Sequence, residues 1–168
     1  MKRQLFFSFY YKNDCWRAAQ VRNIGQIDKN STFCDNDWEE VREKDYSHIK
    51  KWIDEQLQKR SCLVVLIGEN TANRKWINYE IKKAYELNKG IVGIYIHKLS
   101  DKQGKKSEKG ENPFDYVYLP NGEKISKYIK CMDPVNDGFL SVYLSIKYNI
   151  DNLIEYGLEN RPLTWGIK

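Results

Sequence analysis

The chain has 168 residues, of which 41% are hydrophobic and 30% are charged, which excludes a disordered chain. Its length fits one globular domain over residues 1–168 that can bury a core. The net charge of +5 arises from 28 basic and 23 acidic residues. Because both signs are interspersed along most of the chain, the charge does not indicate a nucleic-acid-binding protein. A mild positive field would nevertheless attract an anionic metabolite.

The cysteines and histidines do not form a recognisable metal site or catalytic set. The chain contains Cys15, Cys34, Cys62, Cys131, His48 and His97. Without a C-x-x-C pair or histidines at metal-ligand spacing, we expect no metal site and no Cys-His nucleophile. The N-terminal apolar run is short and cut by polar residues, so it is neither a signal peptide nor a membrane anchor. These features predict a cytoplasmic protein with reduced thiols.

The first part of the chain predicts a strand followed by a helix. Residues 4–11, QLFFSFYY, form an aromatic run typical of a buried strand. Asn13 or Asp14 is expected to cap a helix over residues 15–25, whose last residue is a glycine. Residues 26–45 are rich in Asn, Ser and Asp and have weak periodicity. We expect this segment to be mostly loop with one short strand.

Two helix-strand pairs follow. Residues 46–61 have the spacing of an amphipathic helix, with four apolar side chains on one face: Ile49, Trp52, Ile53 and Leu57. Residues 62–68, CLVVLIG, are continuously apolar, which predicts a central parallel strand covered on both faces. Residues 74–90 predict a helix that ends in a stop signal, and residues 91–97 a second buried strand.

The last part of the chain interrupts this alternation and then ends in a helix. Residues 99–115 are polar and rich in Lys, Gly and Ser, so we expect an exposed loop. Residues 125–134 predict a last short element, and residues 137–161 a long helix with Ile146, Ile150, Leu153 and Ile154 on its buried side. The whole pattern predicts an α/β, flavodoxin-like domain with a central parallel sheet of about five strands flanked by helices.

Several well-known catalytic motifs are absent from the sequence. There is no G-x-G-x-x-G after the first strand, no G-x-x-x-x-G-K-[ST] phosphate loop, no acidic pair after the first strand and no G-x-S-x-G elbow. An enzyme on this scaffold would therefore use carboxylates, amides and aromatic side chains.

Glu80 lies at the edge of the apolar face of the helix predicted over residues 74–90. At about 100° per residue, Glu80 falls about 60° from Ile77, and Trp76 lies about 40° further round. A carboxylate at this boundary, beside an indole, can line a cleft. Spacing alone, however, favours an ordinary solvated Glu80 paired with a nearby lysine.

Three segments resemble the TIR-like domains of the bacterial Thoeris anti-phage system, the ThsB-like family. They are LFFSFYYKND, RSCLVVLIGENT and RKWINYEI, and the similarity extends over the whole chain. The most specific element is W-x-x-x-E, here Trp76 to Glu80, on the helix after the central strand. The Glu of this motif cleaves NAD in TIR-domain enzymes, so the resemblance implies that Glu80 is catalytic.

The resemblance also implies which residues border the substrate. The candidates come from the end of the first strand and the chain after it, from the segment CDNDWEE and from the tryptophan of W-x-x-x-E. They are Ser8, Phe9, Tyr10, Asp14, Arg17, Asn36, Asp37, Trp38 and Trp76. Judged by residue type alone, Phe9 could equally belong to the core, Asp14 could cap a helix, and CDNDWEE could be a turn. We expect Trp76 to support the helix that carries Glu80 more than it touches substrate.

The function implied by the resemblance is consumption of NAD in antiviral defence. A phage-derived trigger would start conversion of NAD, the substrate rather than a cofactor, to nicotinamide and a cyclic ADP-ribose isomer, which would activate a separate effector protein. One carboxylate suits this chemistry, because the reaction passes through an oxocarbenium-like state and nicotinamide leaves without a general acid. Self-association completes the site in many TIR enzymes, and no nucleic acid or membrane partner is expected.

Two other functions remain open. The chain could be a non-catalytic TIR-like module that senses a partner and signals by assembly. It could also be another N-glycosidic enzyme, such as a nucleoside deoxyribosyltransferase, which would likewise use a carboxylate.

Overall fold

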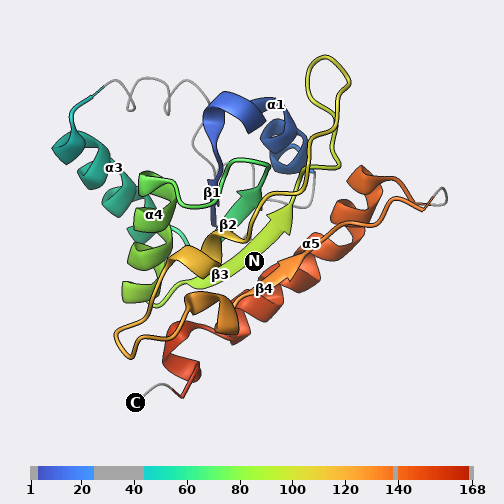
Figure 1. Ribbon diagram of the computed structural model, residues 1–168. Coiled ribbons are helices and arrows are strands. Elements are labelled where there is room, and N and C mark those ends of the chain that lie inside the picture. The colour runs from blue at the N-terminus through green and yellow to red at the C-terminus, as the bar shows by residue number, and fades with distance from the viewer. Residues whose placement is uncertain (1–3, 25–43, 138–139, 167–168) are drawn as a thin grey trace.

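The computed structural model describes residues 4–24, 44–137 and 140–166 (Figure 1). The strands in these ranges form one sheet in the order β1-β2-β3-β4, in which all neighbours are parallel. Their bounds are Leu5–Ser8 for β1, Cys62–Ile67 for β2, Gly90–Tyr95 for β3 and Lys130–Met132 for β4. The predicted α/β class and parallel sheet are confirmed. About five strands were expected, and the one predicted within residues 26–45 falls almost entirely outside the described residues.

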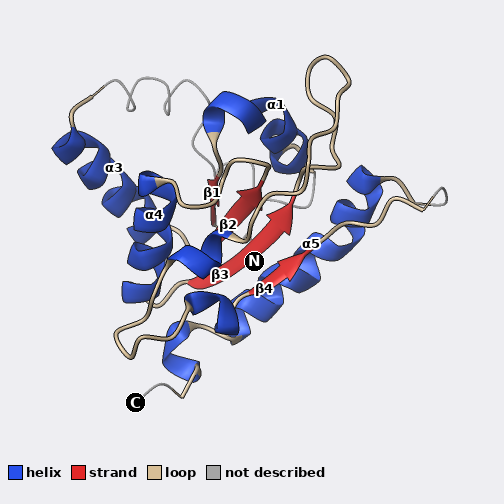
Figure 2. Ribbon diagram, in the orientation of Figure 1, coloured by secondary structure: helices blue, strands red, loops and turns tan. Residues whose placement is uncertain are grey.

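Helices cover both faces of the sheet (Figures 1 and 2). Their bounds are Tyr11–Arg22 for α1, Tyr46–Gln58 for α3, Lys75–Glu86 for α4 and Val142–Glu159 for α5. α1 and α5 contact each other on one face, whereas α3 and α4 contact each other on the opposite face. In the described ranges, no helix is both long enough and apolar enough to cross a membrane.

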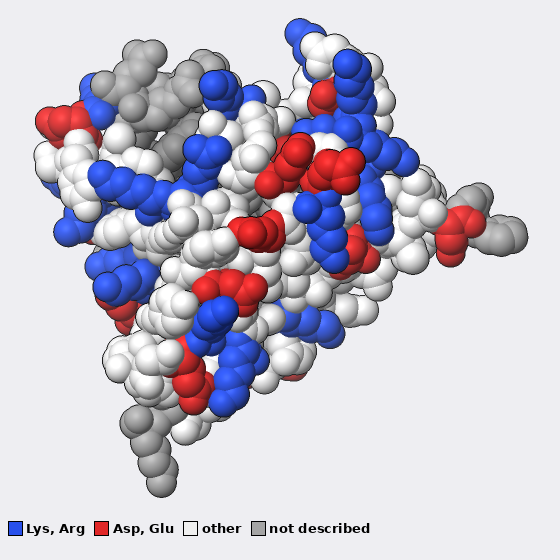
Figure 3. All heavy atoms as spheres, in the orientation of Figure 1, with Lys and Arg blue, Asp and Glu red and all other residues white. Residues whose placement is uncertain are grey.

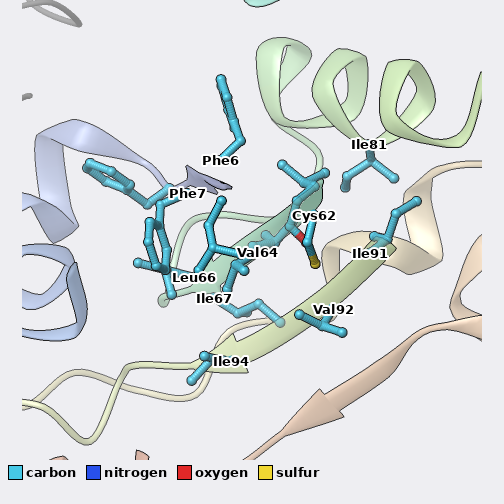
Figure 4. Packing of buried hydrophobic residues seen from close by; sticks show 14 of the residues in the cluster. Phe6, Phe7, Cys62, Val64, Leu66, Ile67, Ile81, Ile91, Val92 and Ile94 are labelled. Carbon is cyan, nitrogen blue, oxygen red and sulfur yellow. The ribbon is translucent and has the colours of Figure 1, made fainter. Parts of the chain in front are cut away.

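The core lies between the sheet and these two helical layers. Every residue of β2 is buried, as a central strand covered on both faces requires. The four apolar side chains predicted to be buried on the last helix are buried in α5. Ile49, Ile53 and Leu57 of α3 are also buried, while Trp52 is half-buried against the Phe6 ring. In Figure 4, Ile81 projects from α4 toward the strands and so joins the helix to this core.

The start of α1 differs from the sequence prediction. The helix begins at Tyr11, and the backbone N–H of Asp14 already donates to the Tyr10 carbonyl oxygen at 3.0 Å. Asp14 therefore lies inside the first turn, where it cannot serve as the N-cap, and the prediction that Asn13 or Asp14 caps the helix is wrong. The reason is that the Asp14 side chain is buried against Gly68, just after β2, where its carboxylate also pairs with Arg17 one turn further along.

The lysine-rich loop after β3 is exposed at its tip and anchored at its base. Residues 102–106 are exposed, as predicted. Arg17 donates from Nε to the Leu99 carbonyl oxygen and from Nη2 to that of Lys105, both at 2.9 Å. Gly110 packs so closely on the turn after β2 that a Cβ atom there would lie 2.1 Å from the Gly68 carbonyl oxygen.

On the face shown in Figure 3, basic and acidic side chains lie side by side, in keeping with their interspersion along the chain.

Candidate active site

The carboxyl end of β1 meets the middle of α4. Side chains alternate along a strand, so Phe6 and Ser8 point to the same face of the sheet. The Phe6 ring contacts Trp52 of α3 at 6.3 Å, which identifies this face as the one covered by α3 and α4. There the Ser8 hydroxyl group donates a hydrogen bond to Oε2 of Glu80. Two of the predicted site residues, distant in sequence, are thus brought into direct contact.

Glu80 is far more buried than helical periodicity suggests. Only 3% of its surface is exposed, although its helical angle places it at the edge of the apolar face. It is not a solvated carboxylate paired with Lys83, since Lys83 instead lies 3.9 Å from Glu86. The strand end explains the difference, because β1 brings Ser8 against this edge of α4 and covers it.

Burial changes the acidity of this group. Loss of solvation raises the pKa of Glu80 from 4.5 to about 8, and the hydrogen bond from Ser8 opposes that rise without cancelling it. Glu80 is therefore largely protonated at pH 7 in the ligand-free protein. Within the described ranges no ion pair engages it, so a positively charged ligand would find a carboxyl group without a cationic partner in a poorly solvated position, and its charge would favour the ionised form.

The loops above this contact are joined by a second one. Tyr10 follows β1, and the Cζ atom of Arg74 lies 3.8 Å from the centroid of its ring. Arg74 also donates from Nε to the Asn70 carbonyl oxygen at 2.9 Å. The loop between β1 and α1 and the loop between β2 and α4 are consequently held together at the N-terminal end of α4.

Three other predicted site residues lie on the α1 side of the sheet. Phe9 is buried beside Tyr11 and beneath the guanidinium group of Arg22. Asp14 is buried against Gly68, and burial raises its pKa even though Arg17, 3.1 Å away, opposes the shift. Arg17 uses its N–H groups on Asp14 and on the carbonyl oxygens of the loop after β3. These three side chains pack α1 against the strands and loops and do not touch Glu80.

Trp76 faces α3. Its ring lies 5.0 Å from that of Tyr46 and 5.8 Å, edge to face, from that of Tyr79. Together with Tyr116 and Tyr118 it lines a groove of about 330 Å³ on the outer side of α4. The position fits a supporting role for the helix that carries Glu80. The remaining predicted residues, Asn36, Asp37 and Trp38, lie outside the described residues.

The turn between β2 and α4 contributes residues that the sequence analysis did not single out. Thr71 is fully buried and accepts a hydrogen bond from the Gly68 backbone N–H at 2.8 Å, which fixes the start of the turn. Asn73 has φ of 59°, the left-handed conformation that Asn tolerates well. Arg74 then precedes the first residue of α4. The sequence feature that could have identified Arg74 is its position as a basic residue directly before the predicted helix.

Glu80 is the candidate catalytic group among the described residues, and the alternatives beside it are metal ligands and thiols. In residues 4–24, 44–137 and 140–166, no group of three or more His, Cys, Asp or Glu side chains could hold a metal ion. Cys15, Cys62 and Cys131 are free thiols, and burial raises the pKa of Cys131 to about 12, which suppresses its thiolate form.

Comparison with known proteins connects this geometry to a family. Residues 6–101 match the family model described as "Thoeris protein ThsB, TIR-like domain". The chain is also 35% identical over 136 residues to a protein of Bacillus cereus (strain MSX-D12) named "Putative cyclic ADP-D-ribose synthase ThsB1". That alignment covers 76% of this chain and 71% of the Bacillus protein. The family match includes both Ser8 and Glu80.

Proposed function

The chain belongs to the family of ThsB TIR-like domains of the Thoeris system, and on that premise we propose that it breaks the nicotinamide-ribose bond of NAD and forms a cyclic ADP-ribose isomer. One observation carries the proposal: Glu80 is a buried carboxyl group, held by Ser8 at the carboxyl end of a parallel sheet. Ligands of open α/β sheets bind at this end of the strands. The printed name of the Bacillus relative supports the same reaction class.

The first chemical step requires charge stabilisation more than proton transfer. The bond between ribose C1′ and the pyridinium nitrogen breaks, its electron pair stays on the nitrogen, and nicotinamide leaves as a neutral molecule. Positive charge then resides on the ribose as an oxocarbenium-like cation. Ionised Glu80 stabilises that charge in a poorly solvated site. The cationic ring of bound NAD also lowers the pKa of Glu80, so that substrate binding favours the carboxylate.

The second step decides between cyclisation and hydrolysis. In cyclisation a nucleophilic group of the same ADP-ribose unit bonds to C1′ and, if it is a hydroxyl group, releases its proton, whereas in hydrolysis water bonds there and releases a proton. Exclusion of water from the site favours cyclisation. We assign the cyclic product the role of a diffusible messenger to a separate effector, with a phage-derived trigger and self-association as the conditions for full activity.

The test is to incubate the protein with NAD, with and without lysate of phage-infected cells, and to identify the products by mass spectrometry. We expect nicotinamide and a cyclic ADP-ribose isomer from the parent protein. Glu80→Gln should form neither product. Glu86→Gln is the matched control, because Glu86 lies on the same helix with a half-exposed side chain, and it should retain activity.

The two other functions give different results in the same assay. A non-catalytic sensing module would leave NAD intact under both conditions. A nucleoside deoxyribosyltransferase would consume nucleosides but not NAD. An active Glu80→Gln variant would contradict the assignment of Glu80 as the catalytic residue.

A further inference from the structure

We propose that Arg74, held on the ring of Tyr10, forms a diphosphate-binding subsite at the N-terminus of α4. The inference rests on the proposed function, and it names the part of the dinucleotide that this end of the site recognises.

Two contacts join β1 and the loop after it to α4 and the residue before it, at different positions along the helix axis. Ser8 meets Glu80, and Tyr10 meets Arg74. Ser8 and Tyr10 are two residues apart, about 7 Å along an extended chain. Arg74 and Glu80 are six residues apart, about 9 Å along a helix axis. Both pairs run in the same direction, so the Arg74–Tyr10 contact lies nearer the start of α4 than the Glu80–Ser8 contact, beyond the carboxyl end of β1.

This spacing matches the connectivity of the proposed substrate. Glu80 is assigned to ribose C1′, where the bond to nicotinamide breaks. The nearest phosphate of NAD is attached to the 5′ oxygen of that same ribose, only a few bonds away. A ribose bound at Glu80 with its 5′ carbon toward the start of α4 thus places the diphosphate next to Arg74.

The guanidinium group of Arg74 is held in position, and its Nη N–H groups are available to a ligand. Its Cζ atom lies over the Tyr10 ring, 3.8 Å from the centroid, and its Nε donates to the Asn70 carbonyl oxygen. Among the residues that the structure describes, none accepts a hydrogen bond from either Nη. Glu69 and Glu111 line the same groove of about 320 Å³ but form no ion pair with Arg74, and Glu111 accepts a hydrogen bond from Tyr116. Two parallel N–H groups of this kind suit a phosphate.

The N-terminus of α4 also attracts an anion, although less strongly than the Arg74 guanidinium group. No side chain in the described ranges caps this 12-residue helix, and its first hydrogen bond runs from the Asn78 N–H to the Arg74 carbonyl oxygen. The N–H groups of the first turn and the helix dipole therefore favour an anion at this position. Arg74 is the residue that makes the site specific for a phosphate.

The test compares two substrates that differ in the diphosphate. NAD carries it, whereas nicotinamide riboside has the same scissile bond without any phosphate. Arg74→Ala should lower kcat/KM for NAD about 10- to 100-fold, mostly through KM, because charge-assisted hydrogen bonds are lost. Its kcat/KM for nicotinamide riboside should equal that of the parent. Arg74→Lys should fall between parent and Arg74→Ala, since Lys keeps the charge but not the fork.

Variants of Tyr10 separate positioning from charge. Tyr10→Leu removes the ring face and should reproduce part of the NAD-specific loss, whereas Tyr10→Phe keeps the face and should lose much less. Arg161→Ala removes an arginine from an exposed position beyond α5 and serves as the matched control. Equal losses with both substrates in Arg74→Ala, or no loss with NAD, would overturn the proposal.

A binding measurement distinguishes this proposal from the proposed function. If the parent releases nicotinamide from neither substrate, the catalytic function fails. Titration calorimetry with ADP-ribose then decides on the subsite: at least tenfold weaker binding by Arg74→Ala supports it, and unchanged or undetectable binding by the parent and variant alike overturns it.

Discussion

The Glu80 carboxyl group should set the pH dependence of NAD cleavage. Burial raises its pKa to about 8, and the ionised form is the one that stabilises a ribosyl cation. We therefore expect kcat/KM for NAD to rise with pH through a single inflection near 8, which reports the free protein. The inflection in kcat should lie lower, because the cationic ring of bound NAD favours the carboxylate. A rate profile that is flat across this range would contradict the assignment.

Replacement of Ser8 should move that inflection. The Ser8 hydroxyl group donates to Glu80 and opposes the rise in its pKa. In Ser8→Ala the pKa of Glu80 should therefore exceed 8, and the rising limb of kcat/KM should shift to higher pH. We expect about tenfold lower activity at pH 7, with partial recovery in more alkaline buffer. Ser61→Ala, an exposed serine just before β2, should leave the profile unchanged.

The same group should destabilise the folded protein at alkaline pH. The folded pKa of about 8 lies above the ordinary 4.5, so the folded state holds its proton over a range in which the unfolded chain has lost it. The stabilising contribution is complete below pH 4.5 and is lost as pH rises to about 8. Glu80→Gln should accordingly gain stability relative to the parent as pH increases, by up to about 5 kcal/mol. Urea unfolding at several pH values measures this difference, and a difference independent of pH would contradict it.

At the level of elements, Arg17 anchors the loop after β3 to α1. It bonds the carbonyl oxygens of Leu99 and Lys105 and pairs with the buried Asp14. Arg17→Ala leaves the Asp14 carboxylate buried without its partner, which should lower the free energy of unfolding by about 3 to 5 kcal/mol. Hydrogen exchange should also rise in residues 99–107. Gln20→Ala removes the hydrogen bonds to the carbonyl oxygens of Ser100 at 2.8 Å and Trp16 at 3.4 Å, and should have a smaller effect on both measurements.

The helices and strands were predictable because each carries its own local pattern. The apolar spacing that defines α3 and α5 and the continuous apolar run of β2 depend only on neighbouring residues. The two failures have the opposite character. Asp14 was expected to cap α1, and helical spacing alone made Glu80 a solvated side chain. Both outcomes are decided by segments far away in sequence, Gly68 and Ser8 respectively, which no periodicity can reveal.

The site itself was predictable only in part for the same reason. Resemblance to TIR domains pointed to Ser8 and Glu80, and the structure brings the two into contact. It also pointed to Phe9, but strand alternation directs that side chain toward α1, away from the α4 face. Arg74 was not singled out, because its significance depends on the Tyr10 ring lying beneath it. Catalysis by Glu80 and substrate contact by the other residues remain predictions.

On the scale of the whole molecule, the candidate catalytic residues lie in one part of the chain, and a helix that packs against the sheet lies in another. The family match covers residues 6–101, which include β1, β2, β3 and α4. α5 lies outside that range and packs against β2, β3, β4 and α1. The parallel order and the helices on both faces agree with a flavodoxin-like arrangement. The integrity of the Ser8–Glu80 contact thus depends on a helix that contributes no residue to it.

A chain that ends at Asp133 should therefore fail to fold. Its truncation removes α5, whose Ile146, Ile150, Leu153 and Ile154 are all buried. Burial of these side chains contributes about 1.5 to 3 kcal/mol each, which together approaches the whole stability of a typical domain. Circular dichroism should show loss of cooperative unfolding, and the exposed sheet face should bind a hydrophobic dye.

The full chain carrying Leu163→Ala is the control for this truncation, because 84% of the Leu163 surface is exposed. It should unfold as the parent does. If the truncated chain instead unfolds cooperatively and retains NAD cleavage, the prediction of a single domain over residues 1–168 is wrong. Residues 6–101 and the strand after them would then form a unit that is stable without α5. Loss of folding in the truncated chain would show that the sheet needs both helical layers before β1 and α4 can hold Ser8 against Glu80.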